Sequence, residues 1–467
     1  MRERTQRRRV VRGELEGVDL GDERRSRRAV GIAERLAERP DLSLPAAMGD
    51  RAWSEALYRH LAGDRVTLEA LVEPHIRRTA GRVATVDVVY AVSDTTDFTF
   101  SGSAPREGLG RVNAKDQGFL AHVTLAVASD RRPMGLLDVQ TWKRGPKKAS
   151  TLWARRNQAR ESEKWARGMR AARERAGSNA GKLIHVADRE GDIYELLAEL
   201  VGSGHRFIIR AGQDRTLLPL DAEDEHRLFE AAQGTPTAFV MKVPLSSRAT
   251  KRQPQGRRAF PARREREATL SFAARAVTLR RAKQRSAKLP PTVPVNIVHV
   301  FELGPPPGEA PVEWLLLTSE PVETRAQVEQ VVAGYRVRWA IEEYFKAIKT
   351  GCAYESRQLE SAHTLQALLG FTLLVAYSLL LMRALSRMGR DEPAEAVLSP
   401  TQIVVLRAKT RKLSPRPTVR EALLAVAGLG GHFKNNGDPG WQTLSKGWAK
   451  LLALEEGYAL AQAVAEK

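Results

Sequence analysis

Three acidic residues stand at positions from which they could do chemistry. Asp94 follows the apolar, β-prone run 83–92, and Asp188 follows a similar run at 183–187. Glu342 lies in a stretch with helical periodicity. Taken singly, each aspartate is typical of a turn or cap. Two aspartates at strand ends of one sheet, however, could offer the oxygen ligands that Mg²⁺ or Mn²⁺ requires.

The predicted helix around Glu342 carries a polar stripe. At about 100° per residue, an arc of about 80° holds Tyr335, Arg338, Glu342, Lys346 and Lys349. The stripe could be a solvent-exposed face with i,i+4 ion pairs. Alternatively, it is a carboxylate flanked by phosphate-binding cations, which would suit a third metal ligand beside a nucleic-acid backbone. The periodicity selects Glu342 and not Glu343, which points away from the basic stripe.

The charge balance favours a polyanionic partner. The 467 residues include 75 Lys+Arg and 55 Asp+Glu, for a formal net charge of +20. Such a chain would bind DNA, RNA or an acidic membrane surface. The stretch 242–288 alone carries a net charge of +13. It is either a disordered basic loop or a β-rich insertion that grips phosphates.

Other features exclude several classes of protein. An apolar fraction of 42% with 28% charged residues excludes wholesale disorder. Cys352 is the one cysteine, so an internal disulfide framework and a cysteine-based zinc site are both excluded. The Arg-rich first 12 residues lead into no apolar segment, so we expect no signal peptide. The uncharged run 365–382 is long enough to span a membrane, but its polar residues and charged flank favour a buried core helix.

The chain divides by its periodicity. Short helices are expected over residues 1–78, where Asp22 caps a basic amphipathic stretch that is either a solvated helix or a DNA-binding module. A mixed sheet that opens with a meander should follow, with helix 151–175 before its last two strands. Its strands are expected at 83–92, 119–128, 134–142, 183–187 and 207–210. Strand-like pieces recur over 214–313, and helices return at 325–387 and 399–467.

Three motifs together resemble the DDE transposases of the bacterial insertion-sequence-four family. They are Asp94-Thr95-Thr96, Asp188-Arg189-Glu190 and Tyr335-x2-Arg338-x3-Glu342-x6-Lys349. The sequences of residues 314–318 and 339–343 also resemble the family, and the resemblance extends from about Leu15 through the C-terminal tail. The resemblance implies an α/β fold with an RNase H-like (retroviral-integrase-like) mixed-sheet catalytic core over 79–387. That core would contain a β-rich basic insertion at about 214–325. It would be flanked by a helical DNA-end-binding domain (1–78) and a helical dimerisation domain (388–467).

The resemblance also implies roles for single residues. Asp94, Asp188 and Glu342 would hold two Mg²⁺ (or Mn²⁺) ions for 3′ nicking, hairpin formation and strand transfer in cut-and-paste transposition. Phosphates near the reacting strand would be clamped by Tyr335, Arg338, Lys346 and Lys349. Trp314 would stack on a flipped base, unless it is a core aromatic, and Arg210 would help to handle that end. From its charge, the insertion would bind end DNA through Arg257, Arg258, Arg263 and Arg264.

These expectations name double-stranded DNA as the partner, as transposon inverted-repeat ends and as target, and a homodimer in the DNA complex. They place the protein in the bacterial cytoplasm, associated with the nucleoid, and away from the membrane. Two alternatives remain. One is a metal-dependent RNase H-like DNA nuclease without strand transfer, and the other is a non-catalytic DNA-binding repressor.

Overall fold

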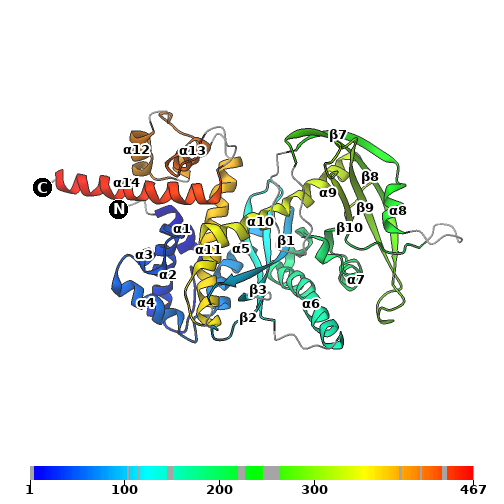
Figure 1. Ribbon diagram of the computed structural model, residues 1–467, viewed down its shortest axis with the longest axis horizontal. Coiled ribbons are helices and arrows are strands. Elements are labelled where there is room, and N and C mark those ends of the chain that lie inside the picture. Colours follow the sequence, from blue (N-terminus) through cyan, green and yellow to red (C-terminus); the bar gives the residue numbers. More distant parts are fainter. Residues whose placement is uncertain are drawn as a thin grey trace.

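The computed structural model describes residues 5–102, 105–112, 116–144, 151–218, 227–245, 263–388, 392–396, 398–410, 413–433 and 439–465. Figure 1 shows an elongated molecule, with the N-terminal and C-terminal helices at one end and the strands of residues 237–303 at the other. The strands that carry the candidate site lie between them and belong to the same sheet as the strands of 237–303.

The N-terminal region is helical, as predicted. Its helices are α1 (Thr5–Glu14), α2 (Glu23–Glu38), α3 (Leu44–Met48), α4 (Arg51–Leu61) and α5 (Leu68–Ala84). Asp22 caps α2, because its Oδ1 accepts the Arg25 N–H at 2.9 Å. The apolar stripe of α2, from Ala29 to Leu36, is buried. The predicted strand start at 83 is wrong, since the buried Val83 still belongs to α5.

A mixed α/β sheet follows, in the predicted order of a meander and then parallel strands. The strands are β1 (Val89–Phe100), β2 (Gly110–Arg111), β3 (Gln117–Ala128), β4 (Pro133–Trp142), β5 (Leu183–Ala187) and β6 (Arg206–Arg210). β1, β3 and β4 pair antiparallel in sequence, whereas β5 pairs parallel with β1 and β6 parallel with β5. The helices α6 (Thr151–Ala176) and α7 (Tyr194–Gly202) precede β5 and β6 respectively.

One sequence prediction about β1 is wrong. The strand does not end before Asp94 but continues to Phe100, paired with β3 along its whole length. Asp94 therefore lies in mid-strand, opposite Val123. The residues that follow Val92 are polar and several are not fully buried, so the apolar pattern of a strand is lost there although the strand continues.

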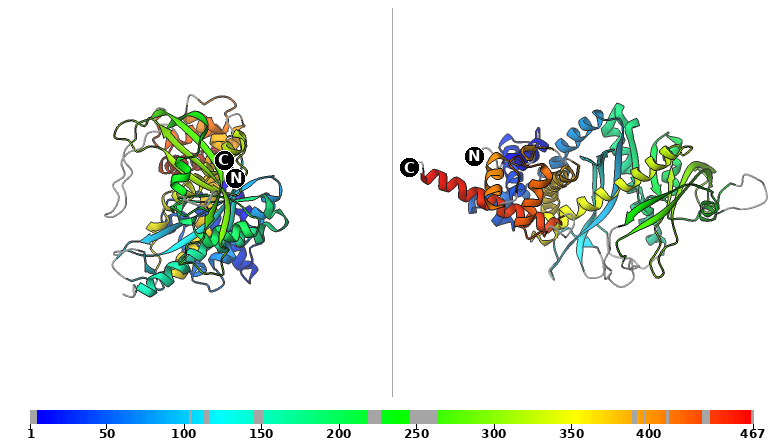
Figure 2. Two further views of the ribbon diagram at one scale, coloured as in Figure 1. Left: turned by 90° about the vertical axis from the view of Figure 1, so that its right-hand side faces the viewer. Right: turned by 90° about the horizontal axis from the view of Figure 1, so that it is seen from above.

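The residues after β6 extend the same sheet. α8 (Leu228–Gln233) precedes β7 (Thr237–Leu245), β8 (Arg266–Arg280), β9 (Thr292–Leu303) and β10 (Glu313–Thr318). β10 pairs antiparallel with β6, and the order continues through β9 and β8 to β7. The right-hand view of Figure 2 shows these long strands at the opposite end of the molecule from the terminal helices. The β-rich character predicted for 214–313 is thus present among the described residues.

Helices cover the sheet on two sides. α9 (Arg325–Val337) contacts β1 and β6, and α10 (Trp339–Lys346) contacts β1. α6 packs against β1, β3 and β4 with a separate set of buried residues. Helices return over 325–387 as predicted, but with interruptions: Arg338 separates α9 from α10, and a π-helical turn at Ala347–Gly351 follows.

α11 (Ala362–Met388) contains the long apolar run. Within the described ranges it is the one helix that is long and apolar enough to cross a membrane, over Ala362–Ala384. In its most apolar window 83% of the residues are buried, and α11 packs on α1, α2, α5 and β4. The predicted buried core helix is confirmed.

The tail is helical as expected, with α12 (Pro400–Lys409), α13 (Val419–Leu429) and α14 (Trp441–Ala465). A glycine lets α13 and α14 touch. A Cβ on Gly447 would lie 1.8 Å from the Val426 carbonyl oxygen, so no larger residue fits at this position.

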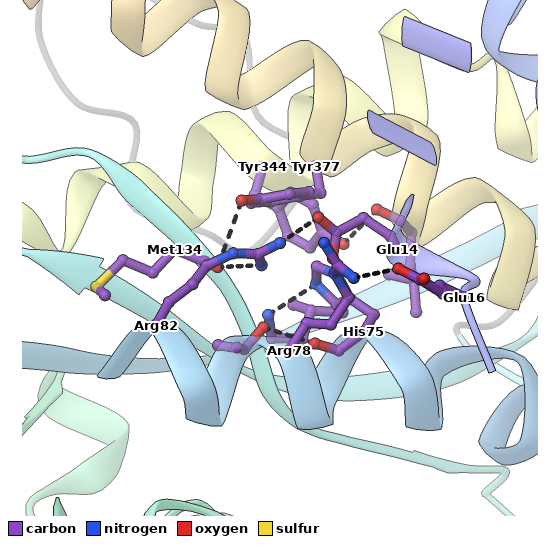
Figure 3. A network of polar contacts seen from close by, with 11 residues as sticks. Glu14, Glu16, His75, Arg78, Arg82, Met134, Tyr344 and Tyr377 are labelled. Carbon is purple, nitrogen blue, oxygen red and sulfur yellow. Dashed lines mark hydrogen bonds and ion pairs between the residues drawn. The ribbon is translucent and has the colours of Figure 1, made fainter. Parts of the chain in front are cut away.

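A buried polar network joins α1 to the sheet (Figure 3). Glu14, at the end of α1, accepts hydrogen bonds from Arg82 and, at 2.6 Å, from His75 Nδ1. His75 Nε2 accepts the Leu136 N–H of β4 at 3.0 Å, and Arg82 donates to the Met134 carbonyl at 2.8 Å. The N-terminal helices are therefore fixed to the sheet through α5.

Candidate active site

Two aspartates lie side by side on neighbouring strands. In the parallel pairing of β1 with β5, Val92 stands opposite Val186, so the same register brings Asp94 level with Asp188. Asp188 directly follows β5 and caps the next turn, because its Oδ1 accepts the Glu190 N–H at 2.8 Å. Asp94 Oδ1 accepts the Thr95 N–H at 2.7 Å. The predicted proximity of the two aspartates is present in the structure.

Arg338 links Glu342 to Asp94. Arg338 Nη1 lies 3.2 Å from Asp94 Oδ2 and 3.5 Å from Glu342 Oε1. The break between α9 and α10 occurs at Arg338 itself. Arg338 and Glu342 lie four positions apart, one helical turn, and Arg338 connects Glu342 to Asp94 on β1.

The electrostatics of Asp94 reflect its crowded surroundings. Burial raises the pKa of Asp94 to about 7, and the nearby charge of Asp188 and, more weakly, Glu342 adds to the effect. The Thr95 N–H and Arg338 oppose it but do not cancel it. Asp94 therefore sits where additional positive charge would stabilise its ionised form.

The donor set suits a hard divalent cation, because it consists of carboxylates. As the side chains stand, no group of three Asp, Glu, His or Cys residues in the described ranges lies close enough to hold a metal ion. The guanidinium of Arg338 stands between two of the carboxylates and supplies positive charge there. The pKa of Asp94 is elevated and Arg338 bridges two of the carboxylates, so a further positive charge would relieve the repulsion among these side chains.

Aromatic and basic residues adjoin the carboxylates, as the resemblance implied. Tyr335 is buried, and its ring meets Trp314 edge-on with centroids 5.4 Å apart. Arg210 shares a hydrogen bond with Tyr335 and donates another to the Glu313 carbonyl at 2.9 Å. Burial lowers the pKa of Arg210, although Tyr335 opposes the shift, and the charges of Arg189 and Arg338 lower it further. These residues form one cluster with the carboxylates.

The two lysines of the predicted stripe contact groups other than the three carboxylates. Lys346 is exposed, with its Nζ 5.3 Å from the ring centroid of Trp339. Lys349 lies in the π-helical turn and pairs with Asp97 at 3.6 Å and Glu355 at 3.4 Å. A π turn rotates each residue less than an α turn, so the ideal helical period does not hold beyond Lys346.

The basic residues of the insertion are only partly described. Arg257 and Arg258 lie outside the described residues. The Arg264 N–H donates to Glu309 Oε1 at 3.3 Å, and Arg263 is close enough to Glu302 and Glu309 to lower the pKa of both. Their role in DNA binding stays a prediction.

Sequence reasoning assigned no role to some residues that the structure places at the site. Arg189 lies beside Arg210, and its position within the Asp188 motif was the available signal. Thr95 Oγ1 bonds His122 Nδ1 on β3 at 3.0 Å, and no local pattern links these two residues.

Two family models match the chain. Residues 7–66 match a transposase DNA-binding domain, which covers α2 and its cap. Residues 167–379 match a transposase DDE domain, which contains Asp188, Glu342 and the Tyr335–Arg338 cluster. Asp94 precedes the second match and joins the site through the register of β1.

Among solved structures, the chain is similar to the piggyBac transposase in a cryo-EM structure of its synaptic complex with hairpin DNA. The sequence identity is 10%, the TM-score is 0.31, and the match covers 66% of this chain. The chain spans about half of that relative, 49% of its length. A TM-score this low supports no inference about the present fold. The two family matches do assign domains: the chain combines the DNA-binding domain and the DDE domain of a DNA transposase.

Proposed function

We propose that the protein is a cut-and-paste transposase of the insertion-sequence-four family, similar to the Tn-five transposase. It would excise its element by 3′ nicking, hairpin formation and strand transfer. The observation that carries the proposal is the pairing of Arg338 with both Asp94 and Glu342, beside Asp188. Arg338 thus links a carboxylate on β1 to one on α10, Asp188 follows the neighbouring strand, and the DDE transposase match includes two of these three carboxylates.

The sheet supports an RNase H-like core. Its strand order is β4-β3-β1-β5-β6, and only β3 runs against the other four. The acidic residues sit on the two central strands, and α10 supplies the third. The strands β7–β10 would then be the β-rich insertion of the catalytic domain.

Asp94, Asp188 and Glu342 would hold two Mg²⁺ (or Mn²⁺) ions. When bound, such ions activate the attacking oxygen and stabilise charge on the leaving oxygen of an in-line displacement. The chain's own contribution is orientation. Asp188 is held by its turn, Asp94 by the Thr95 N–H, and Arg338 can exchange a carboxylate for a DNA phosphate.

The neighbouring aromatic cluster would handle the DNA end. Trp314 is only half-buried, so its ring can accept a base that leaves the stack. Arg210 and Tyr335 lie between Trp314 and the carboxylates, and could fix the phosphates of that nucleotide. This arrangement favours hairpin chemistry over simple hydrolysis.

The partners would be the two transposon ends, the target DNA and a second copy of the chain. End binding would use the basic helix α2, within the matched DNA-binding domain. α14 projects from the body in Figures 1 and 2 and exposes Leu460 and Val464, which are 66% and 74% accessible. Apolar side chains on a projecting helix suit pairing of two copies. Such an enzyme would act in the cytoplasm, at the nucleoid.

The test uses the full-length chain and a duplex that carries the inverted repeat flanking its gene. Incubation with Mg²⁺ should give nicked ends, then hairpins, and finally products joined to a target plasmid. Products that stop at nicks would support the nuclease alternative instead. Binding without any cleavage would support the repressor alternative.

A further inference from the structure

α6 buries a lysine next to the Asp188 turn. The side chain of Lys164 is only 9% exposed, a rare place for an ammonium group. Its Nζ lies 5.5 Å from the ring centroid of Trp142 and 5.7 Å from that of Trp165. The carboxylate that it meets is Glu190, at 3.5 Å. A buried cation is costly unless it is paired, so this position needs a reason.

Glu190 belongs to the turn that presents Asp188. Its N–H donates to Asp188 Oδ1, and the Gly191 N–H donates to the Asp188 carbonyl at 3.1 Å. Trp165 lies under the same turn. A Cβ on Gly191 would lie 3.6 Å from Trp165 Cε3 and 2.6 Å from the Ala187 Cβ. The turn at residues 188–191 thus packs on Trp165 at Gly191 and is tied to Lys164 through Glu190.

The same tryptophan is linked to Asp94. Trp165 packs edge-on against His122, with ring centroids 4.7 Å apart at an interplanar angle of 74°. His122 Nδ1 lies 3.0 Å from Thr95 Oγ1, and the Thr95 N–H donates to Asp94 Oδ1. Lys164 and Trp165, adjacent on α6, therefore contact residues that position both Asp188 and Asp94.

Direct binding to DNA does not explain why Lys164 is buried. Its ammonium group is buried beside two indole rings and is already paired with Glu190, so little of it is exposed to a phosphate. We propose that Lys164 and Trp165 form a platform that positions Asp188 and Asp94, and that Lys164 acts as a positioning residue through Glu190. This inference rests on the proposed function, because it assigns the platform to the site where Asp188 would bind metal ions.

The test compares Lys164→Met, Glu190→Gln and the double variant in the full-length protein. Methionine keeps the length and the indole packing of Lys164 but removes its charge. Three quantities are measured: Mn²⁺ binding by calorimetry, amide hydrogen exchange of residues 188–192, and the rate of end cleavage in Mg²⁺. Removing a group that orients a metal ligand costs about 10–100-fold in metal affinity or activity. We expect each single variant to weaken Mn²⁺ binding at least tenfold and to speed exchange in the turn.

The double variant should bind Mn²⁺ no more weakly than the more affected single variant, because both changes break one ion pair. Arg170→Met is the matched control. Arg170 lies on the same helix and pairs with Glu199 at 2.5 Å, away from the turn, so its substitution should leave Mn²⁺ binding unchanged. If Lys164→Met does not fold, Glu190→Gln decides alone, since Glu190 is 65% exposed and its substitution spares the core.

Unchanged Mn²⁺ binding in Glu190→Gln would overturn the proposal, as would effects that multiply in the double variant. Weaker DNA binding with normal Mn²⁺ binding would make Lys164 a DNA-binding residue and would overturn it too. If the wild-type protein itself neither binds Mn²⁺ nor cleaves, the proposed function has failed instead, and the two failures are therefore distinguishable.

Discussion

Arg338, at the break between α9 and α10, forms an ion pair with Asp94 in the middle of β1, and its Nη1 lies 3.2 Å from Asp94 Oδ2. The ion pair joins residues 244 positions apart in the sequence. The Arg338 guanidinium also pairs with Glu342, so it bridges two carboxylates of the site from the point where α9 ends and α10 begins. The ionisation of Asp94 therefore depends on its neighbours, and that dependence can be measured.

The metal-free protein should show a strong pH effect at Asp94. Its pKa is about 7 in the folded chain against an ordinary 3.8, so the native state binds the extra proton between these values. Stability should therefore fall as pH rises from about 4 to about 7. Asp94→Asn removes the buried charge, and should melt higher than wild type at pH 8, with a smaller difference at pH 5. Thermal melts without metal check this, and equal differences at both pH values would contradict it.

Asp188→Ala should separate DNA binding from cleavage. The substitution removes one proposed metal ligand but leaves α2 and its arginines untouched. We expect binding of paired ends within about twofold of wild type and no release of an end in Mg²⁺, measured by gel shift and denaturing gels. Release of an end by purified Asp188→Ala would show that the site is misassigned.

Trp314→Ala should affect hairpins more than nicks. Base stacking on an aromatic ring contributes about 1–3 kcal/mol, so hairpin formation should slow by roughly 5- to 150-fold. Nicking should be nearly unchanged because the ring of Trp314 packs on Tyr335 and not on a carboxylate of the site. Trp314→Phe keeps a stacking face and is the control. An equal decrease of both rates in Trp314→Ala would instead indicate a structural role in the core.

Neutralising Arg257, Arg258, Arg263 and Arg264 to Gln should weaken end binding and flatten its salt dependence. Each arginine that no longer neutralises a phosphate should reduce the slope of log K against log salt by about 0.9. Lys446→Gln with Lys450→Gln, both on α14, serves as a control remote from the insertion. Binding titrations at several salt concentrations decide the matter, and an unchanged slope would remove the insertion from the DNA interface.

Glu14→Gln should destabilise the protein strongly. Burial alone would raise the pKa of Glu14, but His75 and Arg82 outweigh it and hold that pKa below its usual value. Breaking such a buried pair costs about 3–5 kcal/mol. The matched control is Glu16→Gln, which breaks the exposed pair with Arg78 and should cost less than about 1 kcal/mol. Denaturant melts measure both, and similar decreases in stability for the two variants would refute the assigned importance of the network in Figure 3.

Much of the fold was predictable because its signals are local. The strand at 183–187 has the predicted bounds, α6 ends one residue beyond the prediction, and Asp22 caps α2 as its type and place indicate. Each follows from a buried run or a capping side chain within a few residues. The placement of Asp94 and Asp188 on neighbouring strands also followed, since the two runs before them are both buried.

What could not be predicted depends on distant or irregular geometry. The π turn at Ala347–Gly351 changes the rotation of the residues up to Lys349, and an ideal helical period cannot reveal it. β1 runs past Asp94 because β3 pairs with it to Phe100, whereas the sequence there loses its apolar pattern. The pairing of Lys164 with Glu190 joins two elements whose approach only the assembled sheet determines.

The place of Arg338 between Asp94 and Glu342 has a thermodynamic consequence. In the proposed site, the guanidinium and an incoming cation would compete for the same two carboxylates, and a DNA phosphate would compete with those carboxylates for the guanidinium. A phosphate that attracts Arg338 must therefore raise the affinity for the cation, and the cation must raise the affinity for the phosphate by the same factor. In the proposed site, substrate and metal ion would then be cooperative ligands, and each would raise the affinity for the other.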